Sequence, residues 1–199
     1  MALAWQPSLL DAAGPRFDTR FRDLRRRELG SGAWLDLVPG WVDGAGALFQ
    51  AVLAAASWAE HHWPMYDRVL LEPRLTTRAW DDHPPVVHEM AAALGRRYRR
   101  DLAVVSANLY RDGRDSVAWH GDRVGRQRDD TVVAIVSLGS PRRFLLRPTT
   151  GGRSLRFTPA AGDLLVLGGT VQRTWQHAVP KVARAGPRIS LMFRERDDD

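Results

Sequence analysis

From residue 102 to residue 194 the chain alternates short apolar runs with clusters of turn residues. Runs of this length, bounded by glycine, proline, serine and aspartate, predict β-strands. Glycine-containing turns at 149–152 and 159–162 predict hairpins between neighbouring runs. Strands at such intervals are typical of a sandwich or jelly roll. The expected strands cover residues 102–110, 131–138, 142–147, 154–157, 163–167 and 188–194.

The first hundred residues have a different hydrophobic pattern, which predicts helices beside the sheets. A basic leader at 1–32 precedes a short strand at 33–38. Helical periodicity predicts one helix from Asp43, whose carboxylate suits the first free backbone N–H groups, to near Trp58. A second follows Pro84 and Pro85 and ends in arginines that complement the C-terminal helix dipole. We therefore expect one α+β domain, with N-terminal helices in 33–101 and a jelly-roll core at 102–196.

The chain is strongly basic and has no cysteine. Its formal net charge is +6, its pI is about 10.8, and Lys181 is the only lysine among 29 basic residues. This charge suits a polyanionic partner, although a basic surface can also serve solubility alone. Without thiolates, any metal must be held by nitrogen and oxygen ligands, and a reducing cytoplasm is expected. No signal-peptide pattern or membrane-length apolar stretch is present, so no membrane partner is expected.

The segment His120-Gly121-Asp122, followed later by His177, has the composition of a metal site. Two imidazoles and one carboxylate on one face of a metal leave positions open, as in non-haem iron(II) oxygenases. Side chains alternate along a strand, so His120 and Asp122 are expected to point the same way. A lone His-x-Asp is common at strand ends and turns. The later His177 and an arginine eleven residues beyond it make the metal site the better interpretation.

A second group of polar residues suits a bound dicarboxylate. Arg188, Ser190 and Arg194 lie on one face of the last predicted strand, together with Met192. Asn108 and Tyr110 share a face of an earlier strand and offer an amide and a phenol. Each of these could instead be a structural polar group, but their joint occurrence favours a carboxylate site.

These residues resemble the motifs of the AlkB family of iron(II) and 2-oxoglutarate dependent nucleic-acid dioxygenases. The resemblance is carried by NLYRDGRDSVAWHGD, GDLLVLGGTVQRTWQHAVP and PRISLMFR, and it covers residues 102–194. It is weaker from 33 to 80, where EPRLT also matches. The family pattern Asn-x-Tyr, His-x-Asp, His and Arg-x5-Arg occurs here in order. The resemblance implies a double-stranded β-helix with flanking N-terminal helices, and a nucleotide-recognition segment within 33–101.

The resemblance also implies roles for the site residues. His120, Asp122 and His177 would bind Fe(II), which also takes dioxygen, and Arg188 would pair with the distal carboxylate of 2-oxoglutarate. Arg194 would orient Asp122 near the iron. Hydrogen bonds to the cosubstrate would come from Asn108, Tyr110 and Ser190, the last at a position where the family usually has asparagine.

For an AlkB-like enzyme the substrate is an N-alkylated base in DNA or RNA, presented in a single strand or flipped from a duplex. Hydroxylation of the alkyl carbon releases an aldehyde, while the cosubstrate yields succinate and CO2. The ring of His120 would offer one face to the base, and Trp80 a second. Arg123 follows Asp122 where the family often has an acidic residue, which leaves base preference open. The expected substrate contacts are Arg74, Arg78, Trp80, Arg111 and Arg123.

Two other functions remain open at this point. The same iron site could serve a hydroxylase of a small molecule or a protein, which would favour a closed apolar pocket over a basic groove. A jelly roll without catalysis could act as a binding module. We expect a monomer in each case.

Overall fold

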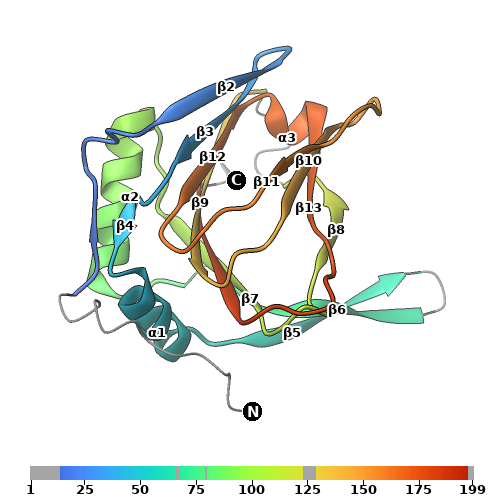
Figure 1. Ribbon diagram of the computed structural model, residues 1–199, viewed down its shortest axis with the longest axis horizontal. Helices are drawn as coiled ribbons and strands as arrows, with labels where there is room; N and C mark the ends of the chain where they lie inside the picture. Colours follow the sequence, from blue (N-terminus) through green and yellow to red (C-terminus); the bar gives the residue numbers. More distant parts are fainter. Residues whose placement is uncertain (1–13, 66–67, 79, 123–128, 197–199) are drawn as a thin grey trace.

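The computed structural model describes residues 14–65, 68–78, 80–122 and 129–196, and two antiparallel sheets dominate it (Figure 1). The larger sheet has, in spatial order, β2 (Arg25–Gly30), β3 (Ala33–Val38), β12 (Leu164–Gly169), β9 (Thr131–Gly139), β14 (Arg188–Arg194), β7 (Val104–Tyr110), β6 (Arg68–Thr77) and β5 (Ala59–Met65). The smaller sheet has β11 (Leu155–Phe157), β10 (Phe144–Pro148), β13 (Trp175–Val179) and β8 (Val117–His120). A further short pair joins β1 (Arg16–Phe17) to β4 (Val42–Asp43).

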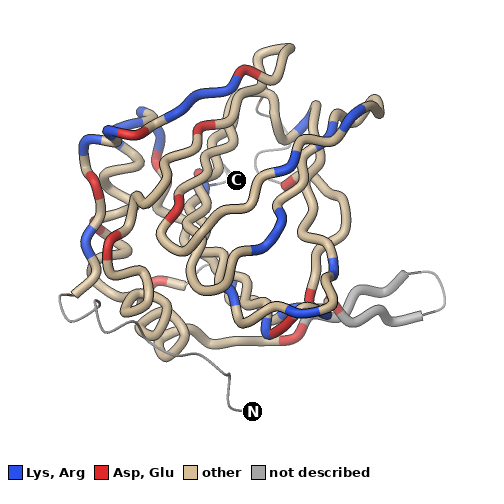
Figure 2. Tube along the Cα trace, in the orientation of Figure 1, with Lys and Arg blue, Asp and Glu red and all other residues tan. Residues whose placement is uncertain are grey.

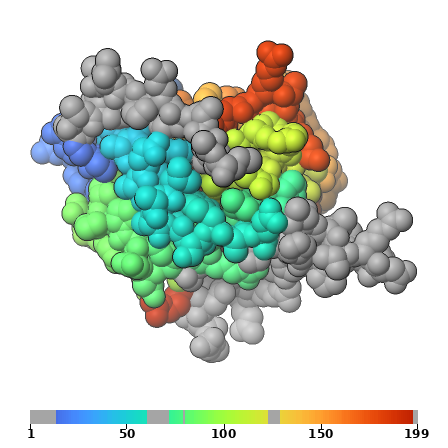
Figure 3. All heavy atoms as spheres, turned by 90° about the horizontal axis from the view of Figure 1, so that it is seen from below, coloured from blue at the N-terminus to red at the C-terminus, as the bar shows by residue number. Residues whose placement is uncertain are grey.

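Three helices complete the described elements: α1 (Ala45–Ala55), α2 (Pro85–Tyr98) and the short α3 (Val171–Thr174). Helices α1 and α2 cover the outer face of the larger sheet, and Figure 3 shows α1 in cyan beside α2 in green on that side. This arrangement confirms the α+β class with a jelly-roll core and N-terminal helices. Within the described ranges, no helix combines the length and the apolar character needed to cross a membrane.

The central strands β9, β12 and β14 of the larger sheet are buried on both faces, which explains their continuous apolar runs. Alternate residues of β14, such as Ile189 and Leu191, pack outward against the helices. Their neighbours face the smaller sheet, where Met192 joins a second core cluster with Phe144 and Val179. The polar residues Arg188, Ser190 and Arg194 share this inward face because side chains alternate along a strand.

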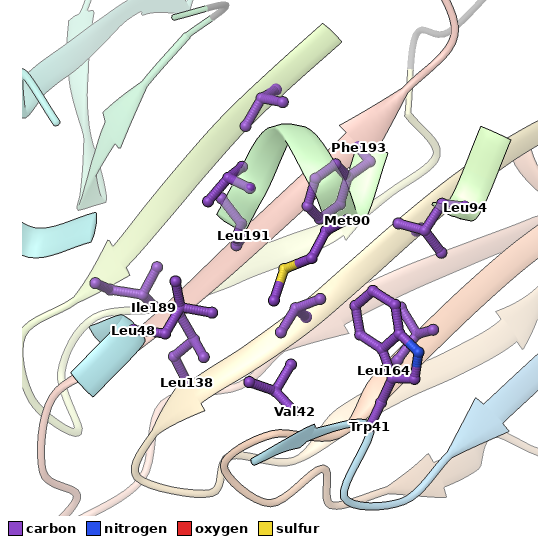
Figure 4. Packing of buried hydrophobic residues seen from close by; sticks show 14 of the residues in the cluster. Trp41, Val42, Leu48, Met90, Leu94, Leu138, Leu164, Ile189, Leu191 and Phe193 are labelled. Atoms are coloured by element: carbon purple, nitrogen blue, oxygen red, sulfur yellow. The ribbon is translucent and has the colours of Figure 1, made fainter. Parts of the chain in front are cut away.

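Met90 of α2 is a central contact of the outer core and is fully buried. Figure 4 shows its side chain beside Leu191 and Phe193 of β14. We expect Met90→Ala to lower the free energy of unfolding by about 2–5 kcal/mol, because it removes buried apolar surface and leaves a cavity. Glu89→Ala, on the adjacent exposed position, is expected to change it by less than about 0.5 kcal/mol. Urea denaturation measures both, and an equal effect would contradict this packing.

Two local expectations are wrong. The first helix begins at Ala45, since Asp43 lies in β4 and Gly44, with φ of 70°, is the N-cap; the helix ends at Ala55. The turn at 159–162 connects β11 to β12, which belong to different sheets, so it closes no hairpin. The turn at 149–152 does join the antiparallel pair β10 and β11, as predicted. The second helix and the predicted strands lie where they were expected, within a few residues.

Candidate active site

His120, Asp122 and His177 converge between the two sheets. Their possible ligand atoms all lie within 4.8 Å of one another. His120 ends β8 and pairs across the sheet with His177 of β13, which brings the two imidazole rings to 4.3 Å between centroids. Asp122 lies two residues after the end of β8, and its Oδ1 lies 3.7 Å from His120 Nε2 and 3.9 Å from His177 Nε2. The three groups can therefore bind one metal ion on a single face.

The two imidazoles are prepared for metal binding in different ways. The Nδ1 of His120 lies 2.9 Å from the carbonyl oxygen of Ala118, and because a carbonyl only accepts, Nδ1 carries the proton and Nε2 is free to bind a metal. Burial lowers the pKa of His177 to about 4, so this imidazole is neutral at physiological pH. His177 also stacks on Phe144, with 5.3 Å between ring centroids. Neutral imidazoles are the form that ligates a metal.

Arg194 holds the third group in its charged form. Its Nη2 lies 3.4 Å from Asp122 Oδ1, and its Nη1 donates to Ser106 Oγ at 2.5 Å. Burial opposes ionisation of Asp122, but the charge of Arg194 and the nearby imidazoles outweigh it and lower the pKa to about 2. Because His177 is neutral near pH 7, Arg194 is the group that keeps a positive charge beside Asp122 at that pH. The carboxylate is therefore available as an anionic ligand.

The backbone of the His-x-Asp segment is fixed by α3. The backbone N–H of Asp122 donates to Gln172 Oε1 at 2.8 Å. A Cβ at Gly121 would lie 2.6 Å from the backbone oxygen of the same Gln172, so only glycine fits this close approach. The sequence around Gln172 did not indicate that its side chain would hold the backbone of Asp122.

Gly121→Ala is expected to weaken iron binding by about 10- to 100-fold, because the added methyl must push the ligand segment away from α3. Anaerobic titration with Fe(II) measures the affinity. Gly14→Ala is the matched control, since nothing lies within 4 Å of a Cβ there. Wild-type iron affinity in the Gly121 variant would contradict the tight packing against α3.

Arg188 is a buried cation with unused donors. It is 1% exposed, and its Nη2 donates to Ser137 Oγ at 2.9 Å. Its Nε and Nη1 have no hydrogen-bond partner among the described residues. An unpaired buried guanidinium is costly, and a bidentate carboxylate is the partner that its geometry suits best. The distal carboxylate of 2-oxoglutarate fits this requirement.

The other predicted cosubstrate residues surround the same region. Asn108, Tyr110 and Ser190 all line a cavity of about 680 Å³ that also reaches the three candidate metal ligands. Arg188 lies beside it, with its Cζ 5.3 Å from the Tyr110 ring centroid. The Asn108 amide contacts Met192 Sδ at 3.5 Å and accepts from Arg74 at 3.3 Å. The donor set therefore fits both an iron(II) ion and a dicarboxylate.

The residues predicted to contact the substrate fall into three groups by their position relative to the cavity. Arg74 and Arg78 line the cavity. Arg111 does not line it, because its guanidinium is bonded to Asp115 at 2.8 and 3.0 Å. Trp80 also lies off the cavity; its ring packs against the outer core and its Nε1 donates to the Asp82 carbonyl at 2.9 Å. Arg123 is outside the described residues.

Aromatic residues line the cavity, and arginines lie on the sheet beside it. Trp119 lines it next to His120, whose side chain is 36% exposed. The guanidinium of Arg147 lies 4.2 Å from the Trp119 ring centroid and is held by Gln176 Oε1. The strands β8, β10, β11 and β13 contain no acidic residue, and Figure 2 shows arginine positions along this sheet and along β2. A negatively charged polymer suits this surface.

Comparisons with known proteins agree with this geometry. The profile of the 2OG-Fe(II) oxygenase superfamily matches residues 46–194. Alpha-ketoglutarate-dependent dioxygenase alkB homolog 3 of Bos taurus is 28% identical over 186 residues, covering 79% of this chain and 64% of the relative. DNA oxidative demethylase ALKBH2 of Arabidopsis thaliana is 33% identical over 149 residues, covering 61% of this chain and 46% of the relative. The chain thus spans less than two thirds of the length of either relative.

One solved structure extends the comparison to fold alone. It is a prolyl hydroxylase from Trichoplax adhaerens, in complex with a hypoxia inducible factor oxygen degradation domain peptide fragment. The TM-score is 0.59 with 12% identity, covering 81% of this chain and 83% of that chain.

Since the superfamily profile matches most of the chain, this protein is a 2OG-Fe(II) oxygenase by family. Within that superfamily it belongs to the AlkB family, as its motifs predicted. Membership of the superfamily confirms the expected set of Fe(II), 2-oxoglutarate and dioxygen.

Proposed function

We propose that this protein oxidatively dealkylates N-alkylated bases in DNA or RNA, releasing an aldehyde, succinate and CO2. The observation that carries the proposal is the position of the three candidate iron ligands, in a cavity that cationic and aromatic residues also line. The similarity to enzymes named as DNA oxidative demethylases supports the same substrate class.

In this proposal different residues bind the metal ion and the cosubstrate carboxylate. Bound iron(II) with 2-oxoglutarate supplies the activation of dioxygen, coupled to decarboxylation of the cosubstrate. His120, Asp122 and His177 hold the ion and leave its other positions open. Arg188 anchors the distal carboxylate, while Arg194 keeps Asp122 ionised and oriented. Removal of water from this buried region strengthens each of these charge interactions.

The substrate must bring a carbon atom to the metal, so the base has to leave its stack. We propose that the exposed ring of His120 receives the base, in a single strand or flipped out of a duplex. Arg74 and Arg78, which line the cavity, would contact phosphates or the base edge, although Arg74 also bonds to Glu72 at 3.2 Å and to Asn108 at 3.3 Å. The basic surface of the smaller sheet would add attraction that depends on ionic strength.

The test is formaldehyde release from methylated oligonucleotides, single- and double-stranded, with Fe(II) and 2-oxoglutarate. We expect one formaldehyde per succinate with at least one nucleic-acid substrate, and none when 2-oxoglutarate is omitted. Release from no oligonucleotide, together with turnover of a free metabolite or a peptide, would replace this proposal with a small-molecule or protein hydroxylase. Binding of nucleic acid without any cosubstrate decarboxylation would indicate a non-catalytic module.

A further inference from the structure

Arg142 is a second buried arginine close to the cosubstrate region. It lies in the connection between β9 and β10 and is 2% exposed. Its Nη1 donates to the carbonyl oxygen of Asp112 at 2.8 Å, and its Nη2 donates to those of Asp115 and Pro180, each at 2.8 Å. One guanidinium therefore joins two loops, at 111–116 and 180–187.

These two loops carry functional residues into the site. The loop at 111–116 leads into β8, which ends in His120, and the loop at 180–187 leads into β14, which begins with Arg188. They touch directly, since the Val182 N–H donates to the Gly113 carbonyl at 2.8 Å. A Cβ at Gly113 would collide with the carbonyl oxygen of Val182. In Figure 3 the yellow-green atoms of the first segment lie beside the orange-red atoms of the second.

Arg142 and Arg188 approach the same phenol ring. The Cζ of Arg142 lies 5.7 Å from the Tyr110 ring centroid, and that of Arg188 lies 5.3 Å from it. Burial lowers the pKa of both guanidinium groups, which reflects the cost of holding two cations out of water. Tyr110 itself lines the cavity. Positive charge is therefore concentrated behind one wall of the cosubstrate site.

Neither arginine forms an ion pair at contact distance among the residues that the structure describes. The carboxylates of Asp115 and Asp112 favour the charge of Arg142 only through space. The nearest acidic side chains are occupied elsewhere, since Asp115 is bonded to Arg111 and Asp112 to Arg114. Backbone carbonyls accept from Nη1 and Nη2 of Arg142, but they do not cancel its charge, and its Nε has no hydrogen-bond partner among the described residues. Buried charges in folded proteins are normally paired, so two unpaired cations point to a bound anion.

We propose that Arg142 is a positioning and specificity residue for the cosubstrate: its charge favours 2-oxo acids with a distal carboxylate, while its three hydrogen bonds align the loops that lead to His120 and Arg188. Arg188 contacts the carboxylate, and Arg142 acts on it through space and through Tyr110. The proposal rests on the cosubstrate of the superfamily and not on the nucleic-acid substrate. It can therefore fail or succeed independently of the proposed dealkylation.

The test compares two ligands in the Fe(II)-loaded protein without oxygen. Dissociation constants are measured by calorimetry for 2-oxoglutarate and for 2-oxopentanoate, which has the same carbon chain but lacks the distal carboxylate. Arg142→Gln removes the charge and keeps hydrogen-bond donors, and we expect it to weaken 2-oxoglutarate by about tenfold and 2-oxopentanoate by less than about threefold. Arg142→Lys keeps the charge with fewer bonds, and its preference for the dianion should stay within about threefold of wild type.

The two variants separate a charge effect from a folding effect. Equal weakening of both ligands in Arg142→Gln would overturn the proposal, because the loss would then not involve the distal carboxylate. So would a loss of preference in Arg142→Lys as large as that in Arg142→Gln, or no change in either variant. Arg143→Gln is the matched control, since this neighbouring arginine is exposed. It should leave both dissociation constants within about twofold of wild type.

Discussion

Replacing Asp122 with alanine is expected to abolish turnover and to weaken iron binding by at least about 100-fold. The carboxylate is the only anionic group within the ligand cluster of the described residues. Its removal leaves two imidazoles and no anionic ligand near Arg194, whose charge then repels a divalent cation. Anaerobic titration with Fe(II) measures the binding, and succinate formation measures the turnover.

An exposed aspartate provides the control for this change. Asp129→Ala alters a carboxylate whose side chain is 84% exposed and which pairs with Arg173 at 2.9 Å, outside the ligand cluster. It should leave iron affinity and succinate formation at wild-type levels. Normal activity of Asp122→Ala at limiting iron would show that this carboxylate is not a ligand.

Replacing Arg188 with alanine is expected to raise the 2-oxoglutarate requirement by roughly 30- to 1,000-fold, which corresponds to about 2–4 kcal/mol for a buried charge pair that loses one partner. The unused Nε and Nη1 atoms of Arg188 are the donors that the distal carboxylate would take. Iron affinity without cosubstrate should change little, because Arg188 is not part of the ligand cluster. The dependence of succinate formation on 2-oxoglutarate concentration gives the measurement.

Arg184→Ala is a suitable comparison, because Arg184 is an exposed arginine in the loop just before β14. Its cosubstrate dependence should match that of wild type. If the Arg188 variant also keeps the wild-type dependence, another cation holds the cosubstrate, and Arg142 becomes the first residue to examine.

The jelly-roll core could be predicted because its strands have strong, simple patterns. The run at 131–138 is apolar at nearly every position, and it forms β9, which is buried on both faces. A strand at His120 was assumed in placing His120 and Asp122 on one face, but the bounds of β8 were not predicted, since Val117–His120 is short and ends before Asp122. Strands β2, β5 and β6 were also missed. The segment of β2 reads as a charged leader, and only pairing with β3 makes it a strand.

The candidate site could be predicted where a residue type carries chemistry by itself. Two histidines, an aspartate and several arginines in a fixed order are enough to suggest metal and carboxylate binding from the sequence alone. Gln172 could not be found this way, because its role comes from the approach of α3 to Gly121, which no local pattern encodes. Trp80 illustrates the opposite case. Its ring suits base stacking by type, but the fold packs it against the core.

The most direct test of the iron and cosubstrate site is a crystal structure with Fe(II) and 2-oxoglutarate, grown without oxygen and measured at the iron absorption edge. We predict a single anomalous peak bonded to His120 Nε2, the Asp122 carboxylate and His177 Nε2, with the distal carboxylate of the cosubstrate on Arg188. An iron peak that lacks any of these three ligands, or a cosubstrate carboxylate held away from Arg188, would contradict the assignment.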